Sequence, residues 1–177
     1  TVLMKGRCKL KHKRRLSCGA SASQKDYLII DLPPGTGDIH LTMVQQVPVT
    51  AAVVVTTPQD IALLDCRKGI AMFDKVHVPT LGIVENMSSF TCPHCGEATA
   101  IFSENGADKL AELHNVDVLA KLPLDLTIRE MSDAGTQITA AKPDSEQAKA
   151  YLALAESVID KIKKLNSRKV SIPVVQG

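Results

Sequence analysis

Residues 27–38, YLIIDLPPGTGD, decide the fold, because a short apolar run leads directly into an acidic residue and a turn rich in proline and glycine. Residues 27–31 have the length and composition of a buried strand. Asp31 ends that strand, where parallel sheets bind ligands, and such an aspartate typically holds Mg2+ directly or through water. Gly35 lets a backbone N–H approach a phosphate without a Cβ in the way. The stretch therefore indicates a nucleotide switch loop, and the alternative is a plain strand-to-helix turn capped by Asp38.

The phosphate cradle that should accompany such a loop is missing from the preceding sequence. A P-loop needs a glycine-rich turn ending in Lys and Ser or Thr, and residues 1–30 contain none. Residues 1–25 instead carry eight of the 21 Lys and Arg residues and none of the 19 acids. We expect residues 1–25 to be a disordered basic leader, residues 26–165 to form one domain, and residues 166–177 to be a loose tail.

The composition excludes several classes of protein. The 177 residues suffice for one domain with a sizeable core, and 45% hydrophobic with 23% charged residues is ordinary for a globular chain. Aromatic residues make up only 3% and Trp is absent, which leaves little for stacking on nucleic-acid bases. No window approaches the roughly 20 apolar residues of a transmembrane helix. We therefore expect no specific nucleic acid and no membrane among the partners, and a cytoplasmic location.

Short apolar runs alternate with segments of helical period from residue 26 onward. The pattern predicts strands at residues 27–31, 51–56, 80–85 and 116–122. It predicts helices at residues 38–46, 58–73, 103–114, 127–133 and 144–165. The strands are almost continuous in Val, Ile, Leu and Ala, as expected for parallel strands covered on both faces. The predicted fold class is α/β, with a doubly wound, mostly parallel sheet whose ligands lie beyond the carboxyl ends of its strands.

Cys92 and Cys95 form a C-x-x-C pair in a turn-like segment, a spacing that lets two thiolates face one metal or cluster. One pair is half a site, because iron–sulfur clusters usually take four thiolates, and a two-fold dimer would complete it economically. A zinc half-site, a redox dithiol and two unligated thiols remain alternatives. Cys66 lies in a helical pattern among apolar residues and is interpreted as a core residue. Glu85 stands at a predicted strand end, and we assign it no role.

Several motifs together resemble the Mrp/ApbC family of iron–sulfur cluster carrier ATPases, which belong to the MinD-like P-loop class. The similar segments are residues 26–38 (DYLIIDLPPGTGD), 55–63 (VTTPQDIAL), 69–73 (GIAMF), 82–88 (GIVENMS), 92–96 (CPHCG), 122–125 (LPLD) and 128–130 (IRE). The resemblance covers residues 26–165, with the motifs in the family's order. It implies a P-loop NTPase fold of the MinD-like type, N-terminally incomplete in this sequence.

The resemblance also implies roles for individual residues. Asp31 would be the catalytic switch aspartate on the magnesium shell, and Gly35 would offer its amide to the terminal phosphate. Asn86 would read the adenine edge, and the loop from Pro123 to Asp125 would close over the base. Cys92 and Cys95 would hold a 4Fe–4S cluster that bridges a homodimer. The implied function is cluster binding and transfer to apo iron–sulfur proteins, coupled to ATP and Mg2+.

The sequence departs from the family where the P-loop and its two lysines should be. Without them nothing neutralises the triphosphate, so we expect ATP binding and turnover to be impaired or lost in this chain alone. We also expect the sheet to lack the central strand beside residues 27–31, which leaves an apolar edge. Three hypotheses follow: a carrier whose P-loop is lost by truncation, a non-enzymatic dimeric scaffold for a cluster or zinc, and an inactive remnant. Whether the chain is an ATP hydrolase stays open at this point.

Overall fold

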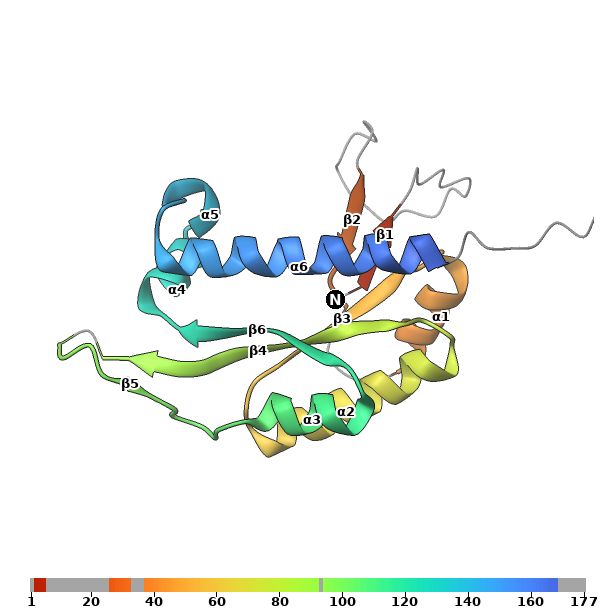
Figure 1. Ribbon diagram of the computed structural model, residues 1–177, viewed down its shortest axis with the longest axis horizontal. Coiled ribbons are helices and arrows are strands. Elements are labelled where there is room, and N and C mark those ends of the chain that lie inside the picture. Colours follow the sequence, from red (N-terminus) through yellow and green to blue (C-terminus); the bar gives the residue numbers. More distant parts are fainter. Residues whose placement is uncertain (1, 6–25, 33–36, 93, 169–177) are drawn as a thin grey trace, which may run out of the picture.

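A computed structural model of the protein describes residues 2–5, 26–32, 37–92 and 94–168 (Figure 1). Within these residues, six strands form one mixed sheet in the order β2-β1-β3-β4-β5, and β6 also pairs with β4. The strands are β1 (Val2–Lys5), β2 (Tyr27–Ile30), β3 (Ala51–Thr56), β4 (Thr80–Thr91), β5 (Ala98–Thr99) and β6 (Asp117–Leu124). The helices are α1 (Asp38–Gln46), α2 (Asp60–Lys75), α3 (Gly106–His114), α4 (Leu126–Asp133), α5 (Ile138–Ala141) and α6 (Glu146–Arg168).

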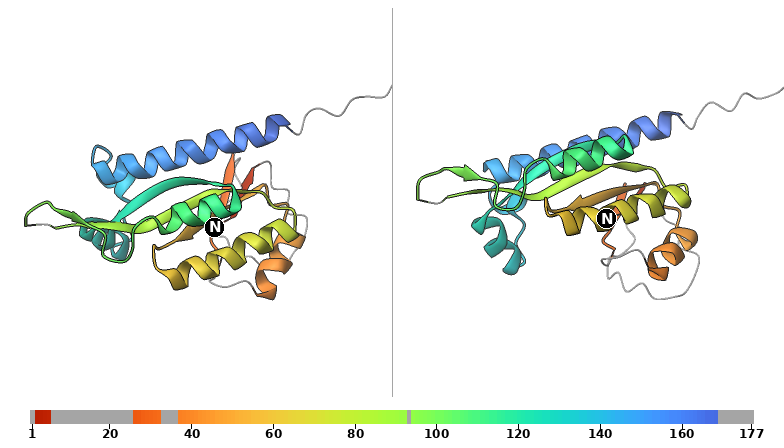
Figure 2. Two further views of the ribbon diagram at one scale, coloured as in Figure 1. Left: turned by 60° about the horizontal axis from the view of Figure 1, so that its bottom comes forward. Right: turned by 90° about the horizontal axis from the view of Figure 1, so that it is seen from below.

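Helices cover both faces of the sheet, as a doubly wound fold requires. Helix α6 lies across one face, and α1, α2 and α3 lie on the other (Figures 1 and 2). Successive side chains of β3 point alternately to one helix layer and to the other. Val53 packs in the cluster that contains Ile162 of α6, whereas Val54 packs in the cluster that contains Ile70 of α2. Because both faces of β3 are buried, its sequence reads as a continuous apolar run.

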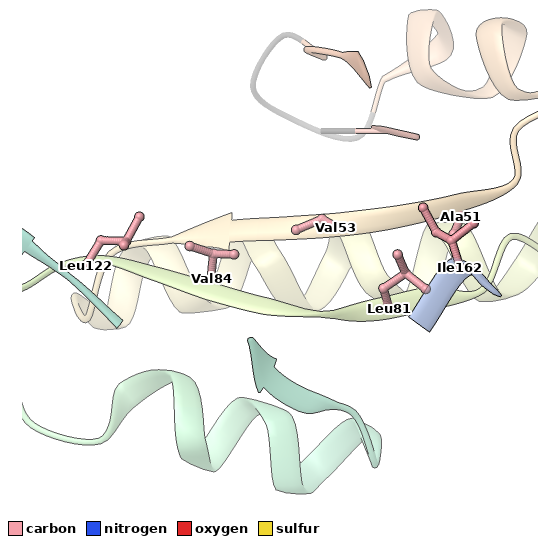
Figure 3. Close-up of a cluster of buried hydrophobic side chains, with 6 residues drawn as sticks. All are labelled: Ala51, Val53, Leu81, Val84, Leu122 and Ile162. Carbon is pink, nitrogen blue, oxygen red and sulfur yellow. The ribbon is translucent and has the colours of Figure 1, made fainter. Parts of the chain in front are cut away.

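The core on the α6 side joins three strands to one helix (Figure 3). Its buried members are Ala51, Val53, Leu81, Val84, Leu122 and Ile162. Tyr151 and Val158 of α6 pack against this cluster, so the last helix turns an apolar face to the sheet. None of the helices in the described part of the chain, α6 included, is long and apolar enough to cross a membrane.

The sheet contains more antiparallel pairing than the sequence predicts. β4 pairs in parallel with β3 and with β6, as expected. β1 and β5 were not predicted, and both pair antiparallel with their neighbours. β5 is only two residues long, and β1 lies in the basic segment, so neither carries a periodic signal. The predicted α/β fold class is confirmed, with a mixed sheet in place of a mostly parallel one.

Strand β1 lies between β2 and β3 and runs antiparallel to both. Val2 pairs with Ile30 on one side and with Ala52 on the other. We expected these first residues to be a disordered leader and the sheet to lack a strand beside β2, and at Val2–Lys5 the structure differs on both points. The rest of that segment lies outside the described residues. β2 is left as the edge strand, and its Ile29 is 65% exposed.

Gly82 allows β4 and β6 to approach each other closely. A Cβ built at this glycine would lie 2.4 Å from the carbonyl oxygen of Asp117 and 2.7 Å from Cγ of Leu119. The first of these atoms belongs to the backbone and cannot move without separating the strands. The backbone φ of Gly82 is +157°, which side chains rarely adopt. A glycine is therefore required where β4 and β6 meet.

Replacing Gly82 with alanine should destabilise the protein by about 2 kcal/mol, because the methyl group overpacks the β4–β6 contact. Gly69→Ala is the matched control, since nothing lies within 4 Å of a Cβ at that position in α2. It should stabilise the fold by roughly 0.5–1 kcal/mol, because alanine favours helix over glycine. Urea unfolding of the three proteins measures both effects. Equal stabilities of native protein and Gly82→Ala would contradict the close approach.

Candidate functional site

One cavity brings together two of the residues predicted for nucleotide binding. It has a volume of about 430 Å3 and is lined by Asp31, Asn86 and the end of β3, with one side of α2 as its wall. Asp31 follows β2 directly and is exposed, so its carboxylate reaches the cavity from the sheet edge. Thr56 and Thr57 add hydroxyl groups at the rim. The predicted Gly35 lies outside the described residues.

Asn86 stands where β4 changes direction. Its amide oxygen accepts the backbone N–H of Met87 at 3.0 Å, and Met87 has a left-handed φ of 57°. The pairing of β4 with β6 shifts register between Asn86 and Phe90, as at a bulge. Because the amide oxygen is used by the backbone of the strand itself, the NH2 group is the part of Asn86 that can face a ligand. A hydrogen-bond donor at this position suits an acceptor nitrogen of a base.

The segment from Pro123 to Asp125 is a strand end and helix cap rather than a loop. Pro123 belongs to β6, in the interval where the pairing with β4 is irregular. Proline has no N–H to donate, so a strand tolerates it where the regular ladder of hydrogen bonds is interrupted, as it is here. β6 continues to Leu124 because that residue pairs with Phe90 in the extended part of β4. The extension of β4 thus explains why the predicted loop is strand.

The carboxylate of Asp125 is engaged within the protein. One oxygen accepts the backbone N–H of Ile128 at 3.1 Å and caps α4, while the other accepts the side-chain amide of Gln147 at 2.7 Å. Burial raises the pKa of Asp125, but the hydrogen bonds from Gln147, Ile128 and Thr127 outweigh it and hold the pKa below its ordinary value. Sequence reasoning missed Gln147, since the two partners lie 22 residues apart.

The cysteine pair lies at the tip of a hairpin made by β4 and β5, which extends beyond the rest of the sheet (Figure 1). Phe90 pairs with Thr99 and Thr91 with Ala98. In the turn, the Cys92 N–H donates to the Glu97 carbonyl and the Gly96 N–H donates to the Cys92 carbonyl, each at 2.9 Å. Gly96 has φ +74°, a conformation that favours glycine.

This turn also changes the acid–base chemistry of the Cys92 thiol. Backbone hydrogen bonds from Cys95 and His94 lower the pKa of the Cys92 thiol, with a further contribution from the Cys95 side chain. The thiolate is the form that binds metals and clusters, so the turn favours the reactive form before any metal arrives. Cys92 is half-buried, Cys95 is exposed, and both are free thiols. Within the described residues, no group of three or more His, Cys, Asp and Glu side chains could hold a metal ion.

Two further residues differ from the sequence interpretation. Cys66 was interpreted as a core residue, but it is half-buried and lines the cavity, where its Sγ donates to the Val55 carbonyl at 3.6 Å. Burial raises the pKa of the Cys66 thiol, so it differs chemically from Cys92. Glu85, to which no role was assigned, is only 2% exposed. Its Oε2 accepts the backbone N–H of Ala107 at 2.8 Å, at the start of α3.

Comparisons with known proteins show which proteins the chain is similar to. The family model for ParA, described as NUBPL iron-transfer P-loop NTPase, matches residues 1–159, which include the basic segment. An iron–sulfur cluster carrier protein of Haemophilus influenzae is 62% identical over 133 residues, covering 75% of this chain and 36% of the relative. The iron–sulfur cluster transfer protein NUBPL of Mus musculus is 52% identical over 140 residues, covering 79% of this chain and 44% of the relative.

A solved structure from Archaeoglobus fulgidus, a nucleotide-binding protein in complex with ADP, is 37% identical with a TM-score of 0.54, covering 68% of this chain and 45% of that one. The cell division ATPase MinD of Pyrococcus furiosus is 28% identical with a TM-score of 0.52, covering 67% of this chain and 46% of that one. This chain therefore spans less than half the length of these relatives. The predicted MinD-like P-loop fold is confirmed.

Asp125→Ala should destabilise the protein by about 1 kcal/mol at pH 7, because α4 loses its N-cap. The pKa of Asp125 is lowered in the folded state, so its contribution is present above the ordinary carboxyl pKa and is lost as the pH falls through the folded pKa. The difference from the native protein should therefore shrink on going from pH 7 to pH 3. Urea unfolding at both values measures it.

Asp133→Ala is the control, since Asp133 lies in the same helix with its side chain 67% exposed and paired only with Arg129. It should change stability little at either pH. A cost at Asp125 that stays constant between pH 7 and pH 3 would contradict the hydrogen-bonded carboxylate.

Proposed function

Because the chain belongs to the ParA family of NUBPL-type iron-transfer P-loop NTPases, we propose that it carries an iron–sulfur cluster on Cys92 and Cys95 and transfers it to apo-proteins. The observation that carries this proposal is the hairpin turn, which places two free thiols together and lowers the pKa of one. Both thiols are reachable from solvent, as a site that must release its cargo requires. Free thiols also suit a reducing compartment, and we propose the cytoplasm.

The cluster would be completed by a second copy of the chain. Two thiols supply half of the four ligands that a 4Fe–4S cluster usually takes, and the described residues near them add no third ligand group. Two apolar residues outside the hairpin are exposed. Phe102 follows β5 and is 40% exposed, and Ile61, near the start of α2, is 79% exposed. The first turns of α2 and α3 point to the same end of the molecule as the hairpin (Figures 1 and 2). These residues suit a two-fold interface.

We propose that the cavity lined by Asp31 and Asn86 is part of the nucleotide site of this family. Asp31 would hold Mg2+, and Asn86 would face the base. Its lining supports this, because a carboxylate and an amide donor share one cavity with apolar walls. Asp125 would act there through the cap of α4, which holds Pro123 and the strand end in place. The 177 residues contain no P-loop motif, so the triphosphate lacks its main binding element in this chain.

Anaerobic reconstitution with iron and sulfide tests the cluster proposal. We expect about two irons per chain in a dimer, with visible absorbance, because one four-iron cluster is shared between two copies. Cys92→Ser/Cys95→Ser should abolish bound iron, while Cys66→Ser should load like the native protein, since Cys66 lies apart from the hairpin. Iron that binds equally to the double variant, or zinc that binds where iron does not, would overturn cluster transport.

Magnesium–ATP should bind this chain with a dissociation constant weaker than about 1 mM, because the phosphates find no lysines or glycine-rich loop. Asp31→Asn should therefore change neither binding nor hydrolysis measurably. Isothermal titration calorimetry and a phosphate-release assay measure the two quantities. Tight, magnesium-dependent binding that Asp31→Asn abolishes would show that the chain cradles phosphates by other means and acts as an ATPase alone.

A further inference from the structure

The residues that return from the cysteine hairpin to the sheet are held at two points. We call residues 100–107, between β5 and α3, the return segment. The hydroxyl of Ser103 donates a hydrogen bond to the carbonyl of Pro58, just after β3. Gly106 packs closely there, because a Cβ on it would lie 3.0 Å from the Pro58 carbonyl oxygen. The return segment is thus attached to the carboxyl edge of the sheet, next to the cavity.

The second point is the buried carboxyl group of Glu85. Helix α3 begins after Asn105, which has a left-handed φ of 60° and caps the helix with no side-chain hydrogen bond. The first N–H groups of a helix need partners, and Glu85 of β4 supplies one by accepting the N–H of Ala107. A buried carboxyl group is costly unless it is hydrogen-bonded, so this contact indicates a specific role.

A cation on the neighbouring strand strengthens this attachment. Lys121 of β6 is the register partner of Glu85 in the β4–β6 pairing. Its Nζ lies 2.5 Å from a carboxylate oxygen of Asp108, in the first turn of α3. Glu85 also contributes to raising the pKa of Lys121, after the larger effect of Asp108, so the three charged groups share one environment. β4 therefore holds the backbone of the first turn of α3 through Glu85, and β6 holds a side chain of the same turn through Lys121.

We propose that Glu85 is a positioning residue for the cysteine pair, acting through the start of α3 and the return segment. The inference rests on the proposed cluster binding at Cys92 and Cys95. The hairpin has only two paired residues on its β5 side, and such a short ribbon holds its shape poorly by itself. Its geometry depends on where its two ends are attached. β4 fixes the outgoing end, and Glu85 with Ser103 fixes the returning end.

The test is the rate at which a reconstituted cluster is lost to excess iron chelator, followed by visible absorbance. Glu85→Ala should lose iron about tenfold faster than the native protein, because the helix start loses its acceptor. Glu85→Gln should stay within about threefold of native, since its amide oxygen still accepts the Ala107 N–H. Ser103→Ala removes the other attachment without opening the core and should accelerate loss about threefold.

Ile162→Val is the control for general destabilisation, because Ile162 is buried on the opposite face of the sheet. Its cluster should be lost at the native rate. Hydrogen exchange in the metal-free proteins is the second readout: amides of residues 100–107 should exchange faster in Glu85→Ala and Ser103→Ala, but not in Ile162→Val. If Glu85→Ala does not fold, Ser103→Ala and Glu85→Gln carry the test.

The outcomes separate this inference from the proposed function. A native protein that takes up no cysteine-dependent iron overturns the proposed function, while hydrogen exchange still reports on the attachment. A native protein that loads normally, with Glu85→Ala and Ser103→Ala losing iron at its rate, overturns the positioning role alone. Equal acceleration in Ile162→Val, or Glu85→Gln as fast as Glu85→Ala, would also overturn it.

Discussion

The pairing of β4 with β3 and β6 is the constraint on which the rest of the structure depends. Among the described strands, β4 runs from the core, past the cavity that Asn86 lines, to the cysteine hairpin. Gly82 fixes how closely it lies against β6. Farther along the same strand, Glu85 holds the start of α3 and Asn86 lines the cavity. A residue of the cavity, Asn86, and the cysteine hairpin are therefore a few positions apart on one strand, rather than on separate loops.

The central strands and most helices could be predicted because their burial leaves a simple pattern. The strand at residues 51–56 is predicted correctly, because the residues of β3 in the two core clusters are apolar. β4 was expected to end at Glu85, since a charged residue normally marks a strand end. It continues to Thr91 because α3 supplies an N–H that lets Glu85 be buried. That donor lies 22 residues away, and no local pattern reports it.

The same difference between local patterns and long-range partners decides which features of the candidate site could be predicted. The cysteine pair and Asp31 are predicted from spacing and from the strand before them, because their chemistry is local. Asp125 is predicted from its motif, but it does not line the cavity, and its hydrogen bond to Gln147 could not be predicted, since α6 brings that amide from a distant part of the chain. β1 could not be predicted either, because Val2–Lys5 is a four-residue strand whose partners lie 22 residues or more away. What the sequence conceals in each case is a long-range partner, and long-range hydrogen bonds leave no periodicity.

Charge links the cysteine pair to association between chains. Amides in the turn lower the pKa of Cys92, so the hairpin favours the thiolate more than an ordinary cysteine would, and nearby residues such as Phe102 expose apolar side chains. Two such hairpins brought together would place like charges side by side, which opposes dimer formation. A cluster between them reverses the sign of that interaction, because its iron ions bind thiolates from both copies. Under the proposed function, binding of the cluster and dimerisation would then be one linked equilibrium, in which each would raise the apparent affinity of the other. In the proposed transfer, the acceptor's thiolates would have to replace those of both chains, after which the charge repulsion would favour separation of the two copies.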